Sequence, residues 1–177
     1  MRVITGKYRG RRIDVPQGFK CRPTTDFAKT GLFNVLRGYA DFETGPSALD
    51  LFAGTGSISL ELLSRGCGSV TSVEAERSGA AFIAQMMRRV GESHCRVVRG
   101  DVFRFIGECA QRFDLVFADP PYALPRLAEL PSLVFEHGLL ASGGVFVLEH
   151  GKEYCFADDV HFVEQRRYGA VNFSFFK

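Results

Sequence analysis

Short apolar runs that end in or beside an acidic residue recur along the middle of the chain. Four such runs occur, at residues 47–51, 69–74, 95–101 and 113–119. Stretches with helical spacing follow the first two, over about 57–65 and 76–90. Runs of five or six mainly apolar residues are typical of buried strands. Their alternation with helices predicts a parallel sheet in an α/β fold.

The first forty residues contain a predicted hairpin and a predicted helix. Two short β-like runs, 2–5 and 11–15, flank a glycine-containing turn, which predicts a hairpin that carries near its tip Lys7, Tyr8 and Arg9. The helix is predicted over about 26–37, with Thr24 or Thr25 at its N-cap.

The last third of the chain is expected to complete the sheet. A helix is predicted within 124–137, starting or interrupted near Pro131, and a fifth strand over 145–150. Alternating residues at 161–164 and 170–175 predict a closing antiparallel pair of strands.

Charge is distributed unevenly along the chain. The 177 residues carry a net charge of +2, but residues 1–40 hold nine basic and two acidic residues, a net of +7, so the remainder carries −5. A basic segment on a mildly acidic body favours nucleic acid as a partner, although a basic run can also be only a solvated face. We therefore divide the chain into a basic arm, residues 1–40, and a body, residues 41–177. The candidate nucleic-acid contacts are Lys7, Arg9, Arg11, Arg12 and Arg22.

Composition disfavours several classes of protein. No apolar run approaches the roughly 18–20 residues that a membrane span needs, and the start of the chain lacks the apolar stretch of a signal peptide. The five cysteines form no CxxC pair, which predicts reduced thiols in a cytoplasmic protein. The four histidines show no ligand spacing, so no metal site is expected. We expect one monomeric globular unit.

The most informative stretch is Asp119-Pro120-Pro121-Tyr122, which ends the fourth run. The two prolines stop the strand abruptly because neither can donate a ladder hydrogen bond. A carboxylate, a rigid pair of carbonyls and an aromatic ring are thereby left where open α/β sheets bind ligands. These groups suit an amino-bearing heterocycle. Taken alone, an Asx-turn that ends the strand explains them equally well.

A small-residue loop follows the first run. Gly54 and Gly56 let the backbone approach a ligand closely, but Ser59 stands where a dinucleotide fingerprint has its third glycine, so this signal is weak by itself. The acids of the four runs are expected to form a negative mouth at one edge of the sheet: Asp50, Glu74, Asp101 and Asp119. Such a mouth disfavours a pyrophosphate. It suits S-adenosylmethionine, which offers a sulfonium, an ammonium, two ribose hydroxyls and an adenine amine.

Two of these motifs resemble those of a known class of enzyme. Residues 50–56, Asp-Leu-Phe-Ala-Gly-Thr-Gly, resemble motif I of the Rossmann-like methyltransferases, and residues 119–122 resemble motif IV of those that methylate amino groups. More narrowly, nearly the whole chain resembles the bacterial 16S ribosomal RNA guanine-N2 methyltransferase family, RsmD. The match includes Ile4-x-Gly6-x-Tyr8-x-Gly10, Arg22-Pro23-Thr24-Thr25-Asp26, Leu32-Phe33-Asn34, Leu63-Ser64-Arg65-Gly66, Glu149-His150 and Arg167-Tyr168-Gly169. The chain departs from the family pattern at Ser59 and in residues 27–31, where charges are fewer.

The resemblance implies a Rossmann-like α/β fold, with a seven-stranded sheet in the order 3-2-1-4-5-7-6. It implies S-adenosyl-L-methionine as cofactor, and small-subunit ribosomal RNA, free or in the 30S subunit or its assembly intermediate, as partner. The cofactor contacts that it implies follow the first three strands: Asp50, Ala53, Gly54, Gly56, Glu74, Asp101 and Val102. Among these, Asp50 would orient the amino-acid end, Glu74 would accept the ribose hydroxyls, and Asp101 would accept from the adenine amine or cap a helix.

The implied reaction is methyl transfer to the exocyclic N2 amine of a guanine. The implied catalytic residues are Asp119, Pro120, Pro121 and Tyr122. The carboxylate and the Pro120 carbonyl would accept the two amine hydrogens, and the tyrosine would stack on the base. His150 is expected to make a hydrogen bond at a strand end rather than to act as a base.

Two other functions stay open at this point. A DNA adenine-N6 methyltransferase shares motif IV but normally needs a sizeable target-recognition domain. A non-catalytic RNA-binding or ribosome-assembly protein on a methyltransferase scaffold would not need Asp119 or Gly54, yet both are present. A nicotinamide-dependent dehydrogenase is disfavoured by the acidic mouth and the missing third glycine.

Overall fold

The computed structural model describes residues 1–16 and 25–177, and their fold is built on one mixed sheet. The strand order is β3-β2-β1-β4-β5-β7-β6, which confirms the predicted topology. Strands β1 to β5 are parallel, and β7 runs antiparallel to both β5 and β6. The bounds are β1 Ser47–Leu51, β2 Ser69–Glu74, β3 Cys95–Arg99, β4 Phe113–Ala118, β5 Leu140–His150, β6 Phe162–Tyr168 and β7 Val171–Phe176.

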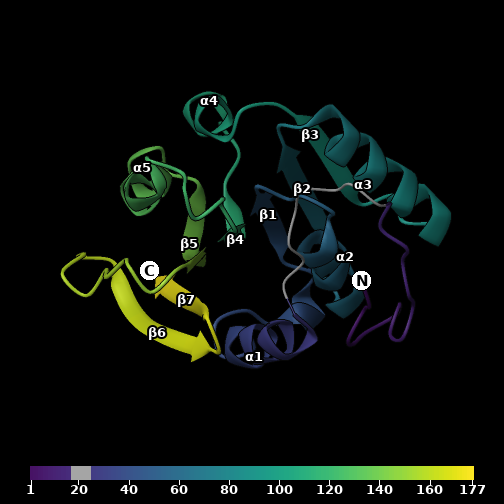
Figure 1. The fold of residues 1–177 in the computed structure, drawn as a ribbon, viewed down its shortest axis with the longest axis horizontal. Helices are drawn as coiled ribbons and strands as arrows, with labels where there is room; N and C mark the ends of the chain where they lie inside the picture. The colour runs from purple at the N-terminus through teal and green to yellow at the C-terminus, as the bar shows by residue number, and fades with distance from the viewer. Residues whose placement is uncertain (17–24) are drawn as a thin grey trace.

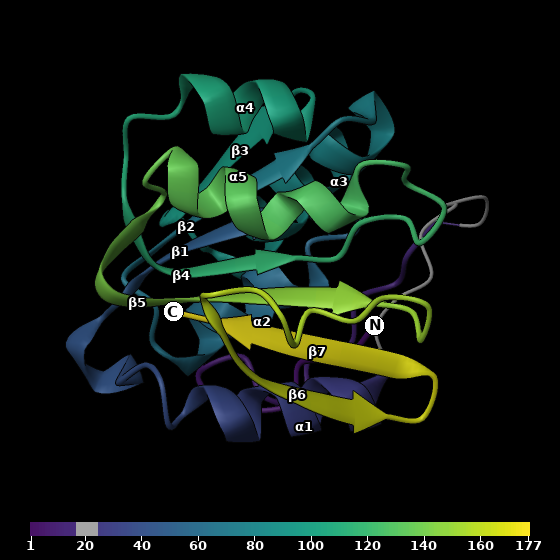
Figure 2. The same ribbon diagram turned by 90° about the vertical axis from the view of Figure 1, so that its left-hand side faces the viewer.

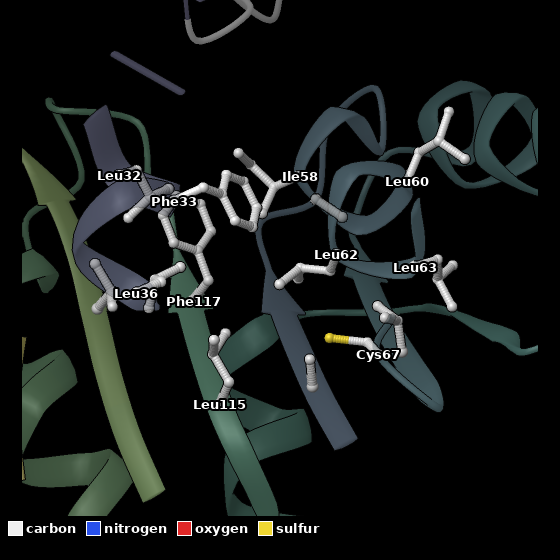
Figure 3. Close-up of a cluster of buried hydrophobic side chains, with 14 of the residues drawn as sticks. Leu32, Phe33, Leu36, Ile58, Leu60, Leu62, Leu63, Cys67, Leu115 and Phe117 are labelled. Atoms are coloured by element: carbon white, nitrogen blue, oxygen red, sulfur yellow. The ribbon is translucent and has the colours of Figure 1, made fainter. Parts of the chain in front are cut away.

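Helices cover both faces of the sheet, with α1, α2 and α3 on one side and α4 and α5 on the other (Figure 1). Figure 3 shows the first of two apolar clusters, where side chains of α1 and α2 meet Leu115 and Phe117 of β4. The bounds are α1 Asp26–Leu36, α2 Ser57–Arg65, α3 Arg77–Val90, α4 Val102–Glu108 and α5 Leu130–Glu136, with short 3-10 turns η1 Phe42–Thr44 and η2 Leu127–Glu129.

Most of the predicted elements lie where the pattern placed them. Helix α1 begins after Thr25, whose hydroxyl accepts a hydrogen bond from the Ala28 N–H and so supplies the expected N-cap. Strand β5 is longer than the predicted 145–150, because its pairing with β4 shifts register at the glycine pair before Val145 and continues back to Leu140. The closing strands β6 and β7 also extend beyond their predicted ends.

Residues 1–16 form a short hairpin, less extensive than the one predicted from residues 2–5 and 11–15. Its two arms pair through the bridge between Arg2 and Arg12 and through backbone hydrogen bonds that join Val3 to Arg11 and Ile13 to Met1. The pairing stops there because the next backbone groups bond helix α2 instead: the N–H groups of Ile4 and Thr5 donate to the Glu61 carboxylate at 2.8 and 3.0 Å. Tyr8, expected near an exposed tip, is buried, and its hydroxyl donates to Glu92 at 3.0 Å.

A buried cluster of charges, which we call the buried clasp, fixes this turn to the body; it consists of Lys29, Glu61 and Arg65. The Lys29 Nζ donates to the Arg2 carbonyl at 2.7 Å and lies 3.6 Å from the Glu61 carboxylate. The Arg65 Nε donates to the same carboxylate at 2.8 Å. Burial lowers the pKa of Lys29, against the opposing effect of Glu61. The division at residue 40 stays a prediction, but the described part of the arm shares the core of the body.

In the described part of the chain, no helix has both the length and the apolar character needed to cross a membrane. Cys67, Cys95, Cys109 and Cys155 are free thiols.

Candidate functional site

The carboxyl ends of β1, β2, β3, β4 and β5 meet at one edge of the sheet, where Figure 2 shows the arrowheads of β4 and β5 pointing the same way. In register, Leu51 of β1 lies beside Val73 of β2 and Ala118 of β4, and Ala118 lies beside Leu148 of β5. The residues that follow these positions therefore lie together, as the acid-ended runs predicted.

The loop from β1 to α2 has an unusual backbone. Phe52 has φ 61°, a left-handed conformation that is strained for a bulky residue, and Gly54 and Gly56 follow with φ 54° and 70°. The Ala53 N–H donates to the Val73 carbonyl at 2.9 Å, which holds the loop against β2. This sequence of left-handed residues turns the chain sharply at the carboxyl edge, and residues 53–56 of the loop are buried. The sequence motif did not reveal that Phe52 is strained.

Glu74 lies directly against this loop. One of its carboxylate oxygens accepts from the Gly54 N–H at 2.7 Å, and the other accepts from the Glu76 N–H at 2.8 Å. The carboxylate is therefore held rigidly where β2 ends. Each oxygen retains a second lone pair, which is the capacity that two ribose hydroxyls require.

Asp50 lies deeper than the other acids, beneath the first turn of α2. Its carboxylate accepts from both the N–H and the hydroxyl of Ser59, at 3.0 and 2.5 Å, and that hydroxyl lies 2.6 Å from the Ser72 hydroxyl. Complete burial raises the pKa of Asp50 to about 7, although the bonds from Ser59 oppose the rise. Ser59, which departs from the family pattern, thus satisfies a buried carboxyl group.

Asp101 and Val102 form the start of α4. The Asp101 side chain accepts from the Arg104 N–H at 2.9 Å, so the capping alternative is correct for one of its oxygens. The Val102 N–H lies in the first helical turn, where backbone donors have no partner within the helix. Phe103 makes an edge contact with Phe52, with ring centroids 6.4 Å apart. Sequence reasoning missed Phe103.

The Asp119-Pro120-Pro121-Tyr122 motif leaves β4 beside the β1 loop. The Asp119 N–H makes a long contact of 3.4 Å with the Leu51 carbonyl. Burial, and then the charges of Glu149 and Asp50, raise the pKa of Asp119 well above that of an exposed carboxyl group. The Tyr122 hydroxyl donates to Glu149 at 3.2 Å, and burial followed by the Glu149 charge raises the pKa of this tyrosine.

Glu149 is the main residue of this edge that the site prediction missed. It is buried at the end of β5, one strand from Asp119, and it fixes the Tyr122 hydroxyl. The signal was present, because Glu149 also ends an apolar run. Beside it, His150 is fully buried, with its ring nitrogens 2.7 Å from the Gly151 carbonyl and 2.8 Å from the Ser174 hydroxyl. Burial lowers the pKa of His150, and its contacts confirm a hydrogen-bonding role at the strand end.

The predicted nucleic-acid contacts lie at the surface, but they are not equally free. Arg9, Arg11 and Arg12 are exposed, and the Arg11 guanidinium lies 5.2 Å from the centre of the Tyr8 ring. Lys7 is half exposed and forms an ion pair with Glu92 at 2.6 Å, which raises the pKa of Lys7. Arg22 lies outside the described residues.

Comparison with known proteins identifies relatives along the whole chain. The family model described as "Conserved hypothetical protein 95" matches residues 1–177. Ribosomal RNA small subunit methyltransferase D of Escherichia coli (strain K12) is 32% identical over 84% of this chain and 74% of its own length. YlbH of Bacillus subtilis (strain 168), provisionally named an rRNA methyltransferase, is 32% identical over 100% of this chain and 98% of its own.

A solved structure from Thermus thermophilus, described as a hypothetical protein, agrees with the fold. It is 31% identical, covers 100% of this chain and 99% of its own, and superimposes with a TM-score of 0.87. The match of the family model to the whole chain and the identity to the E. coli protein lead to one conclusion: this chain belongs to the RsmD family, the family of ribosomal RNA small subunit methyltransferase D.

Proposed function

We propose that this protein transfers a methyl group from S-adenosylmethionine to the exocyclic N2 amine of a guanine in small-subunit ribosomal RNA. One observation carries the proposal: the residue 119–122 motif leaves β4 beside the Gly54 loop of β1, since Leu51 and Ala118 are paired neighbours. An amine acceptor and a cofactor loop are therefore adjacent. The names of the relatives support ribosomal RNA as the substrate class.

The residues at the edge fit this cofactor. Glu74, held by two backbone N–H groups, has lone pairs for ribose hydroxyls, and Gly54 has no side chain that would keep a ligand away from the loop backbone. The second oxygen of Asp101 is suited to accept a hydrogen bond from the adenine amine, and the Val102 N–H is suited to donate one to the adjacent ring nitrogen. When bound, S-adenosylmethionine supplies an electrophilic methyl group on a sulfonium centre.

Two acceptors are proposed to prepare the target amine. The guanine amine is a poor nucleophile because its lone pair is delocalised into the ring. The Asp119 carboxylate and the Pro120 carbonyl would each accept one amine hydrogen and favour a tetrahedral nitrogen. Because burial, and then the charges of Glu149 and Asp50, raise the pKa of Asp119, its ionised form is a strong acceptor. The same negative charges stabilise the positive charge that develops on nitrogen.

Tyr122 is proposed to stack on the target base. Its hydroxyl is fixed by Glu149 while 39% of the residue stays exposed, so one part of the ring is anchored and another is accessible. Stacking of a base on an aromatic side chain contributes about 1–3 kcal/mol. The exposed arginines of residues 1–16 would then hold the flanking phosphates.

The test measures label transfer from S-adenosylmethionine to small-subunit RNA, free and in partly assembled subunits from cells that lack the enzyme. Digestion should release N2-methylguanosine. Asp119→Ala should lose methyl transfer while keeping most of its cofactor affinity, and Asp158→Ala, which changes an exposed aspartate, serves as a matched control. N6-methyladenine in DNA would overturn the substrate assignment. Full activity of Asp119→Ala would overturn the mechanism.

A further inference from the structure

Exposed aromatic side chains are rare on this protein. The 177 residues include 17 Phe and 5 Tyr. Among the described residues, the exposed large hydrophobic side chains are Phe27, Tyr122, Val160 and Val163. Tyr122 already belongs to the proposed site. Phe27 is the more exposed of the two aromatic residues, at 70%, and the site described above does not use it.

Phe27 lies at the same edge of the sheet as Tyr122. It occupies the first turn of α1, whose start lies on the side of the molecule toward which β4 and β5 point (Figure 2). The turn between β6 and β7 is at this edge too, because Asn172 of β7 pairs with His150 at the end of β5. The three strand spacings from β4 to β6 amount to about 14 Å, a distance that a few nucleotides can span.

Tyr168, at the end of β6, makes a pair with Phe27. The two ring centroids are 5.8 Å apart with an interplanar angle of 78°, an edge-to-face contact. Edge-to-face is a preferred arrangement of aromatic pairs, and within this pair Phe27 is exposed while Tyr168 is half-buried. The pair is therefore a preformed surface, which we call the aromatic platform.

Helix α1 has a glycine, Gly31, at the position where Tyr168 packs against it. A Cβ built on Gly31 would lie 2.1 Å from the Tyr168 Cε1 atom, so no other residue fits beneath the ring. A glycine in a helix interior costs about 1 kcal/mol relative to alanine. Tyr168 also packs against Phe173 of β7, and the two ring centroids are 6.0 Å apart. The position of Tyr168 is thus fixed by close packing, in contrast to that of a loosely exposed ring.

Basic side chains flank the platform. Arg2 forms an ion pair at 2.9 Å with Asp26, the residue before Phe27, and remains half exposed. Arg166, two residues before Tyr168 and hence on the same face of β6, is half exposed and paired with Glu164. Arg167 is exposed, donates to the Gly169 carbonyl at 3.0 Å, and forms no ion pair within the described part of the chain. An exposed and a half-buried aromatic ring between arginines match an unpaired nucleotide, which offers a flat base and an anionic phosphate.

We propose that Phe27 and Tyr168 stack an unpaired base of the RNA substrate, at a position in the strand distinct from the methylated nucleotide. The proposal rests on the function proposed above and specifies how the RNA is held. Tyr122 then reads the target, while the platform holds a neighbouring base and the arginines hold phosphates. The contribution is sequence-tolerant, because every base has a π-face.

The chain contains no tryptophan, so Phe27→Trp creates a single fluorescent reporter. Small-subunit RNA, free or in the assembled subunit, should quench this tryptophan by stacking. Val160→Trp is the matched control, because Val160 is exposed at 90% and precedes β6 at the opposite edge; its emission should not change. A blue shift without quenching would indicate burial against protein and overturn the proposal.

A second measurement separates this proposal from the proposed function. Phe27→Ala should weaken RNA affinity by about 5- to 150-fold, leave cofactor affinity unchanged and leave the salt dependence of binding unchanged, since no charge is removed. Val160→Ala should match the parent. If the parent methylates RNA and Phe27→Ala keeps the parental kcat/KM and affinity, the platform is refuted and the function stands. If the parent does not methylate RNA, the proposed function itself fails.

Discussion

The buried clasp offers a direct test of how burial changes the contribution of an ion pair to the free energy of unfolding. Glu61 and Arg65 are four residues apart on α2, and their Oε1 and Nε atoms are 2.8 Å apart with both side chains buried. Arg104 and Glu108 on α4 have the same spacing, the same two atoms and the same 2.8 Å distance, but both side chains are largely exposed. The two pairs differ in the order of the residues, in their exposure to solvent and in the further partners of Glu61.

The perturbation is Glu61→Gln, with Glu108→Gln as the matched control. The Glu61 carboxylate accepts from Arg65 and from the Ile4 and Thr5 N–H groups. A glutamine offers one acceptor oxygen and turns its amide N–H toward donors. Breaking a buried pair by removing one partner costs about 3–5 kcal/mol, whereas an exposed pair contributes at most about 1 kcal/mol. For a domain of this size the predicted fall in Tm is about 6–20 °C for Glu61→Gln and at most about 4 °C for the control.

Urea unfolding followed by circular dichroism measures the free energies of unfolding, and calorimetry measures the Tm values. The m-values should stay similar, so that the midpoints compare stability and not a change in denatured-state compactness. Equal, small losses in the two variants would refute the reasoning. They would mean that water reaches the clasp or that the arm is not anchored through Glu61.

Three further predictions concern the proposed site. Gly54→Val places a β-branched residue at φ 54° and should abolish S-adenosylhomocysteine binding in calorimetry while circular dichroism shows a folded chain; unchanged affinity would contradict the assignment of the loop. Because the ionised form of Asp119 is the proposed acceptor, kcat/KM should fall as pH drops through its raised pKa. Glu149→Gln removes a neighbouring negative charge, so it should move this acid limb to lower pH; an unmoved limb would assign it to another group. The RNA affinity of the parent should fall as the salt concentration rises. When alanine replaces Arg9, Arg11 and Arg12, the slope of log affinity against log salt concentration should flatten by roughly 0.7–0.9 for each phosphate contact that is lost. A parental slope in this triple variant would leave these arginines as a solvated face.

Local signals in the sequence were sufficient for the fold and for much of the edge. The acid-ended apolar runs located β1, β2 and β4, and the capping threonine located the start of α1. These features depend on neighbours within a few residues, which a pattern can show. The same rule applied to the fifth apolar run would have found Glu149.

What the pattern did not reveal depends on distant partners. Tyr8 has the sequence context of a hairpin tip, but its side chain is buried. Its hydroxyl donates a hydrogen bond to Glu92, which lies 84 residues away in the sequence. The left-handed Phe52 precedes an N–H that bonds β2, and Lys29 is buried beside a carboxylate on another helix. Periodicity does not report such pairings, so the sequence predicts an N-terminal arm but not its contacts with the body.

The anchoring of residues 1–16 also determines when they can fold. Their contacts with Glu61 and Glu92 span 57 and 84 residues, respectively. At a synthesis rate of roughly 5–20 residues per second, the second partner is made about 4–17 s after Tyr8, whereas chain ends meet within microseconds. The ribosome, not diffusion, therefore sets the order of assembly. Residues 1–16 therefore cannot complete these contacts until β1, α2, β2 and α3 have been synthesised, and their docking marks the formation of this half of the sheet.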